Sequence, residues 1–277
     1  MKWTIVFSIG VFWALMMYFL FDREIRPYLD EQAPLSYRQF LFNRDRLQTV
    51  EMTILRGVRR RKIGMYRATI TPEKSGFFKL VEHVGLDVQF GTLTLHATTE
   101  TKTTIDPEFQ LALLSMTMEC GGKSLNLTGA RIGQDKLKII MDSPLTGKEE
   151  RMLPFSRDMT LSNDFSPFIR LPGLRVGREW TVYTLSPNFL KRDVSIVPLR
   201  ARVVERETQE WGGRTEVPVH RIEVSTPEAD GTVMYRVWTD LDGRVLIVEQ
   251  GDGSDQDMLR IERAPDAADD GGGNGER

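Results

Sequence analysis

Apolar and polar side chains alternate along long stretches of this chain, most clearly over residues 78–90. The apolar positions there are Phe78, Leu80, Val84, Leu86, Val88 and Phe90. Successive side chains of a strand point to opposite faces, so this spacing predicts a β-strand with one apolar face. The same alternation recurs at residues 93–95, 137–141, 197–203 and 233–237.

Turn-forming residues separate these stretches at short intervals. Glycine, aspartate and proline supply the backbone angles of tight hairpins. They stand at residues 72–76, 106–108, 120–123, 133–135, 211–213 and 242–243. Only residues 161–171 have a partly helical pattern, and Pro167 keeps that helix short. We therefore expect an all-β body built on an antiparallel sheet.

The sequence divides into four segments around this body. We expect a transmembrane anchor at residues 1–21, a juxtamembrane linker at 22–48, a β-rich domain at 49–263, and a disordered tail at 264–277. The tail is rich in aspartate and glycine and has no large apolar side chain that could be buried.

The anchor prediction rests on an uncharged run over residues 3–21. As a helix this run is about 28 Å long, which nearly matches a hydrocarbon core of about 30 Å. It is longer than the apolar stretch of a cleaved signal peptide, and no small-x-small cleavage site follows it. A lipoprotein signal is excluded because Cys120, the only cysteine, lies far from the run.

The orientation of the anchor is open on charge alone, since Lys2 precedes the run while Arg23 and Arg26 follow it. The short leader before the run is typical of a signal-anchor. We expect a single-pass protein of the cytoplasmic (inner) membrane whose C-terminal domain is extracytoplasmic, in the periplasm of the cell envelope.

Few side chains in the sequence suggest catalysis, metal binding or nucleic-acid binding. A net charge of −2 provides no global field that would attract nucleic acid. Cys120 has no nucleophile signature around it, and His83, His96 and His220 lack the spacing of metal ligands. We expect no enzymatic activity, no metal site and no cofactor.

One basic run is a candidate contact for an anionic head group. It consists of Arg59, Arg60, Arg61 and Lys62. Such a run is able to bind a phosphate or an anionic lipid. The alternative, which short basic runs favour, is a solvated turn between two strands, bracketed by Gly57 and Gly64.

Three phrases carry a resemblance to a known family. They are RKIGMY at residues 61–66, LRVGREW at 174–180 and VWTDLDGRVL at 237–246. In their order they resemble the β-rich module that precedes the catalytic core of bacterial envelope transglutaminase-like proteins. That module is similar to the half-barrel of periplasmic lipoprotein carriers of the Lol type. The catalytic core of the transglutaminase-like proteins has no counterpart here, so no catalytic residue is carried over.

The resemblance implies a strongly curved antiparallel sheet whose concave face is partly filled by a short helix. Phe165, Phe168 and Ile169 would share one face of that helical plug and contact a ligand. In the lipoprotein carriers the concavity holds acyl chains, so the expected function is non-enzymatic binding of a lipid, a lipoprotein or another apolar ligand. The alternative is a scaffold or accessory subunit of an envelope protein complex, with no ligand.

Overall fold

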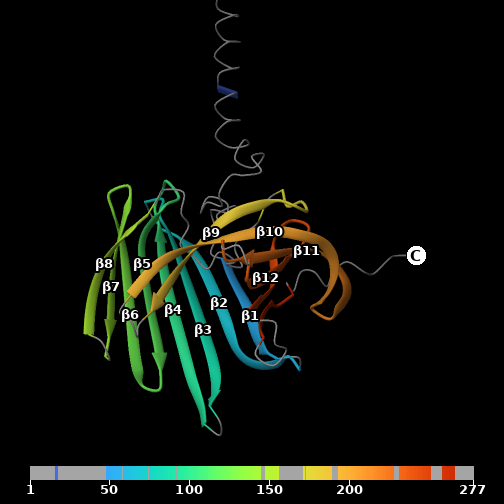
Figure 1. Ribbon diagram of the computed structural model, residues 1–277, viewed down its shortest axis with the longest axis horizontal. Helices are drawn as coiled ribbons and strands as arrows, with labels where there is room; N and C mark the ends of the chain where they lie inside the picture. The colour runs from blue at the N-terminus through green and yellow to red at the C-terminus, as the bar shows by residue number, and fades with distance from the viewer. Residues whose placement is uncertain are drawn as a thin grey trace, which may run out of the picture.

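The computed structural model describes residues 16–17, 48–57, 59–73, 75–90, 93–144, 147–155, 171, 173–188, 193–227, 231–250 and 258–265. The described residues form one 14-stranded antiparallel sheet (Figure 1). Its first eight strands are β1 (Gln48–Arg56), β2 (Arg61–Pro72), β3 (Phe78–Phe90), β4 (Leu93–Ile105), β5 (Leu111–Cys120), β6 (Lys123–Ile132), β7 (Lys136–Ser143) and β8 (Gly147–Pro154). The other six are β9 (Glu179–Asn188), β10 (Asp193–Trp211), β11 (Arg214–Ser225), β12 (Val233–Thr239), β13 (Val245–Gln250) and β14 (Leu259–Arg263).

Two meanders make up the sheet. Strands β1 to β8 each pair with the next in sequence, and so do β9 to β14. Pairing of β1 with β14 joins the two meanders in the middle of the sheet, where Ile54 lies opposite Ile261. The edges of the sheet are β8 and β9, which do not pair with each other, so hydrogen bonds do not close the sheet into a barrel.

The sheet is strongly curved (Figure 1), as the resemblance to the half-barrel module implies. Figure 1 shows β2 to β8 as a curved wall, with β9 and the long β10 passing across its open side. Strand β10 reaches β8 at the far edge of the sheet. Side chains on the inner face of this curve form the main core, which includes Leu80, Leu127, Ile139, Val203 and Ile222. The alternating apolar residues therefore serve to fill the concave side.

A second, smaller core lies apart from the main one. It consists of Trp211, Val219, Trp238, Leu246 and Ile247. The Trp238 Nε1–H donates a hydrogen bond to Glu207 at 2.5 Å, and the Trp211 Nε1–H donates one to the Arg263 carbonyl at 2.9 Å. These bonds satisfy both indole donors, so the β10–β11 hairpin is fixed against the neighbouring strands.

A ladder of alternating charges crosses strands β9 to β14 on the face opposite the main core. Each member lies directly across from the next in the strand register, and neighbours have opposite charges. The members are Glu179, Arg202, Glu223, Arg236, Glu249 and Arg260. Opposite charges placed across a strand pair stabilise that pairing, and a slip by one residue would break the whole set.

The turn at residues 240–243 has a close contact with residue 171. Gly243 has φ +78°, and a Cβ on it would lie 2.1 Å from the Leu171 carbonyl oxygen. The Leu171 N–H in turn donates to the Gly243 carbonyl at 2.9 Å. Only glycine fits here, both because of its backbone angle and because of this close contact, which explains the glycine of the VWTDLDGRVL phrase.

Several expectations fall outside the described residues. They concern the anchor except for the helical pair Met16 and Met17, the linker before Gln48, the plug at residues 161–170 and the tail after residue 265. Within the described part of the chain, no helix has both the length and the apolar character needed to cross a membrane.

Candidate functional site

An apolar cavity of about 400 Å³ lies on the inner side of the curved sheet. It is enclosed by side chains of β1, β2, β3, β9, β12, β13 and β14. They are Met52, Ile54, Tyr66, Val84, Leu86, Val182, Thr184, Tyr235, Val248, Gln250, Leu259 and Ile261. Its size is within the usual range of small-molecule sites, about 300–1,000 Å³, and its mainly apolar lining is typical of them.

The strand register explains why these side chains meet. Tyr66 lies opposite both Met52 and Val84, so three adjacent strands present one continuous row to the cavity. Ile261 lies opposite both Ile54 and Val248, which extends the lining across the junction of the two meanders. Residues far apart in sequence therefore share one concave surface.

A buried acidic residue stands at the edge of this lining. Glu82 lies two residues before Val84 on the same face of β3, and only 3% of it is exposed. The Tyr66 hydroxyl donates a short hydrogen bond to the Glu82 carboxyl group. Burial raises the pKa of Glu82 to about 7, and the hydrogen bond from Tyr66 opposes that rise. Glu82 is thus partly protonated near neutral pH.

The outer face of β2 to β5 has a larger and more polar hollow of about 1010 Å³. Its charged side chains are paired and mostly exposed: His96 Nδ1 lies 3.0 Å from Asp87 Oδ1, and His83 Nε2 lies 3.5 Å from Glu100 Oε2. Exposed ion pairs of this kind contribute little to the stability of the fold, because water competes for both partners. The interior cavity is therefore the better candidate for an apolar ligand.

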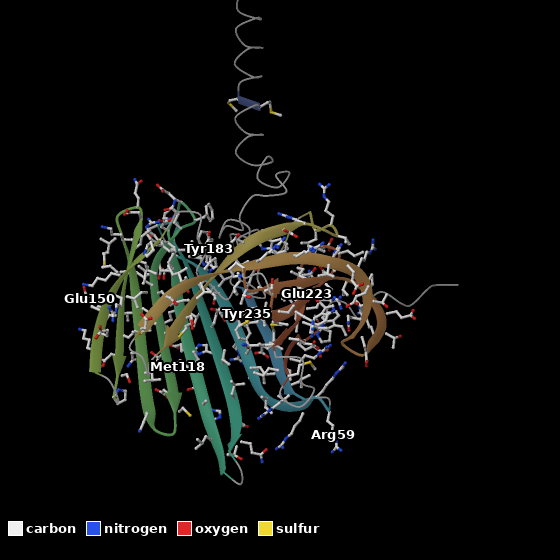
Figure 2. All side chains as sticks on the ribbon, viewed as in Figure 1. Arg59, Met118, Glu150, Tyr183, Glu223 and Tyr235 are labelled. Carbon is white, nitrogen blue, oxygen red and sulfur yellow. The ribbon has the colours of Figure 1, made fainter. Side chains whose placement is uncertain are left out.

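The predicted basic run lies at one end of the molecule. Figure 2 shows Arg59 projecting from the lower end, while Tyr235 of the cavity lies near the centre of the view. Arg60 Nη1 is 3.9 Å from Glu210 Oε2, and the Arg61 guanidinium donates to Gln89 at 3.4 Å. Lys62 lines the polar hollow. Two members of the run thus contact different strands, and a role in head-group binding stays a prediction.

The residues considered for catalysis are dispersed. Cys120 is exposed at the end of β5, and His83 and His96 pair with carboxylates on the outer face. His220 is buried in β11, and burial lowers its pKa. The described residues contain no group of three or more His, Cys, Asp or Glu side chains arranged to hold a metal ion.

The predicted ligand contacts Phe165, Phe168 and Ile169 lie outside the described residues. Sequence reasoning did not identify Tyr66 and Glu82, although a signal for Glu82 exists. In the alternation from Leu80 to Val84, Glu82 occupies a position of the apolar set. A carboxylate at such a position faces the interior and needs a partner, which here is Tyr66.

Comparison with known proteins finds a likeness in fold to a solved structure. No protein-family model matches the sequence, and no curated protein matches it. The fold is similar to the crystal structure of a beta-barrel-like protein of a domain of unknown function, DUF1849, from Brucella abortus. The two chains share 11% sequence identity, with 79% of this chain and 95% of the other covered and a TM-score of 0.47. The resemblance to the transglutaminase-associated module and to lipoprotein carriers stays a prediction.

Proposed function

We propose that the domain is a non-enzymatic binding module that takes up a lipid, the acyl part of a lipoprotein or another apolar ligand in its interior cavity. The observation that carries this proposal is the cavity of about 400 Å³ with its mainly apolar lining. An apolar chain gains free energy when it leaves water for such a surface, at about 25 cal/mol per Å² of area buried.

The lining is suited to a flexible, unbranched ligand. Met52 has a side chain that adapts to irregular shapes, while Tyr66 and Tyr235 supply large apolar rings with polar tips. Thr184 and Gln250 add polar groups to the lining, which would orient one end of the ligand. This combination of many apolar contacts and few polar ones is typical of sites for amphiphiles.

The proposal places the domain at a membrane. The uncharged run at residues 3–21 would tether it to the cytoplasmic membrane with the β-rich domain outside, where lipids and lipoproteins are within reach. The plug residues Phe165, Phe168 and Ile169 would then line the entrance, as the resemblance to lipoprotein carriers implies.

Native mass spectrometry of the full chain, extracted from membranes in detergent, tests this function. The wild type is expected to retain an apolar ligand, and Val248→Trp is expected to lose it because the indole fills the cavity. Val81→Trp is the matched control, since Val81 is also a half-buried strand valine but faces outward beside Lys102. Equal retention by all three proteins, or none by the wild type, would refute the proposal.

A second candidate function is a scaffold or accessory subunit that docks on an envelope protein. One observation favours it: an outer-face hollow of about 400 Å³ surrounds Leu113, which is 53% exposed. Exposed apolar side chains in such a hollow are typical of protein contacts. Leu113→Glu would then abolish co-purification of a partner, whereas Val248→Trp would leave it unchanged.

A further inference from the structure

The outer-face hollow around Leu113 combines apolar and cationic side chains. Its described lining contains three lysines, three hydroxyl side chains and no acidic residue. The lysines are Lys79, Lys102 and Lys138, and the hydroxyl groups belong to Thr104, Ser115 and Thr128. Ammonium and hydroxyl groups donate hydrogen bonds, so this hollow offers an anion several donors beside an apolar surface.

The strand register extends this surface to the edge of the sheet. Leu113 of β5 lies opposite Ala130 of β6, and Ala130 lies opposite Lys138 of β7. Lys138 in turn lies opposite Met152 of β8. Leu113 and Met152 are 53% and 49% exposed. Exposed apolar patches are typical of protein or membrane contacts, and lysines beside such a patch are attracted to anionic lipids.

Two of the lysines have carboxylate partners but are still able to bind a second anion. Lys102 contacts Glu100, and Lys138 Nζ lies 2.8 Å from Glu150 Oε1. The side chains of Lys102 and Lys138 are 45% and 35% exposed, and exposed ion pairs of this kind are weak. Each ammonium group also has three N–H donors. With Lys79, three lysines against two glutamates leave this surface cationic.

The hollow lies at the end of the sheet where the chain enters the β-rich domain. Gln48, the first residue of β1, lies opposite Ile70 of β2, and Ile70 lies opposite Leu80, the neighbour of Lys79. This is the upper end of the curved wall in Figure 1. The proposed tether at residues 3–21 would join the domain at this end. A tether raises the effective concentration of the bilayer, so even a weak contact is populated.

We propose that the outer face of β4 to β7 around Leu113 docks on an anionic lipid bilayer, with the lysines at the lipid phosphates. This inference rests on the membrane placement in the proposed function but not on the interior cavity. The turns at this end contain the exposed Glu73, Glu108 and Asp135, which an anionic surface repels. The domain therefore lies on its outer face rather than on the tips of these turns. An acidic protein segment would suit the same lysines, but the bilayer is favoured because the chain enters the domain at this end.

The test uses the full chain in nanodiscs of neutral phosphatidylcholine or of anionic phosphatidylglycerol. A nitrobenzoxadiazole fluorophore, whose emission rises when it leaves water, is attached at Thr128→Cys in a Cys120→Ser background, since Cys120 is the only cysteine. Thr94→Cys is the matched control, because Thr94 is also an exposed threonine but lies near the other end of β4. We expect higher emission from position 128 in phosphatidylglycerol than in phosphatidylcholine, and equal emission from position 94 in both.

Removal of two lysines should reverse this effect. Each lysine near an anionic surface contributes roughly fivefold, so Lys102→Gln with Lys138→Gln should lower the ratio of docked to undocked domain by about 25-fold. Lys123→Gln with Lys148→Gln removes two exposed lysines at the far end of the sheet and should change nothing. Val248→Trp should also leave the emission unchanged, because docking does not use the interior cavity.

Equal emission from position 128 in the two lipids would overturn this inference and leave the binding function intact. A rise seen in native membranes but in neither nanodisc would also overturn it, and would assign the hollow to a protein partner. A chain that enters neither nanodisc would refute the membrane placement in the proposed function itself.

Discussion

Arg260 Nη1 lies 2.7 Å from Glu249 Oε1 across the β13–β14 pair, and their side chains are only 6% and 13% exposed. Arg260 Nε also contacts Glu262 Oε2 at 3.2 Å. This is the buried end of the charge ladder, whereas at its opposite end the side chains of Glu179 and Arg202 are 36% and 59% exposed. One ladder thus contains both a buried and a solvated ion pair.

Replacement of Arg260 by Met should strongly destabilise the fold. It leaves the buried Glu249 carboxylate without its cation, and breaking a buried pair in this way costs about 3–5 kcal/mol. Arg202→Met removes an exposed partner of Glu179 and should cost about 0–1 kcal/mol. Urea unfolding followed by tryptophan fluorescence compares the two. Similar losses for both would contradict the difference in burial.

Glu82 should make stability fall as pH rises. Its pKa is about 7 when folded against an ordinary value of 4.5, so between these two values the folded state binds the extra proton. Ionisation of the buried Glu82 therefore lowers the free energy of unfolding. This loss is absent below pH 4.5, grows up to pH 7 and is about 3 kcal/mol above that. Glu82→Gln should therefore match the wild type near pH 4.5 and melt higher at pH 8, by roughly 6–12 °C. A difference in Tm that does not change with pH would rule out this titration.

His220, in contrast, should make stability fall as pH decreases. Burial lowers its pKa below the ordinary value of 6.5, so the unfolded state binds the proton more readily as pH falls through 6.5. The stability that the neutral imidazole permits is present above pH 6.5 and lost below it. His220→Gln should remove this loss, so that the melting temperature of the variant falls less than that of the wild type between pH 7 and pH 5. An unchanged acid slope would show that His220 does not titrate in this range.

We expect Gly64 on β2 to tolerate no side chain, whereas Gly85 on the adjacent strand β3 should tolerate a small one. A Cβ at Gly64 would lie 2.1 Å from the Gly85 carbonyl oxygen, so Gly64→Ala forces β2 and β3 apart and should cost about 1–3 kcal/mol. A Cβ at Gly85 has its nearest neighbour, His96 Cε1, at 3.9 Å. Gly85→Ala should therefore be neutral or stabilising, since glycine weakens a strand by roughly 0.5–1 kcal/mol. Thermal unfolding of the two variants distinguishes them, and equal losses would be inconsistent with this packing.

Local pattern predicts the strands of this protein well but not their long-range contacts. The alternation at Leu137, Ile139 and Met141 gives the inner face of β7, where all three are buried. Trp238 stands in the polar set of its strand, yet it is buried in the second core. The reason is that the β10–β11 hairpin brings Trp211 to it, which no local spacing reveals.

The candidate site could not be predicted from the sequence, because it too depends on long-range contacts between strands. Its lining joins Ile54 to Ile261 through the β1–β14 pairing, which brings together two strands from nearly opposite ends of the chain. Pattern alone places an apolar residue on the inner face of a strand. Whether that face is filled by other side chains or left open depends on the curvature of the sheet and on the path of β9.

Photo-crosslinking in native membranes tests the central claim, that the inner side of the curved sheet binds an apolar ligand. A dodecanol analogue with a diazirine on its alkyl chain is activated in membranes that contain the full-length protein, and the labelled peptides are then identified. We predict labelling of the cavity residues Met52, Val248, Leu259 and Ile261, and its loss in Val248→Trp but not in Val81→Trp. Labelling confined to residues 1–21 and to the outer face around Leu113 would contradict the claim.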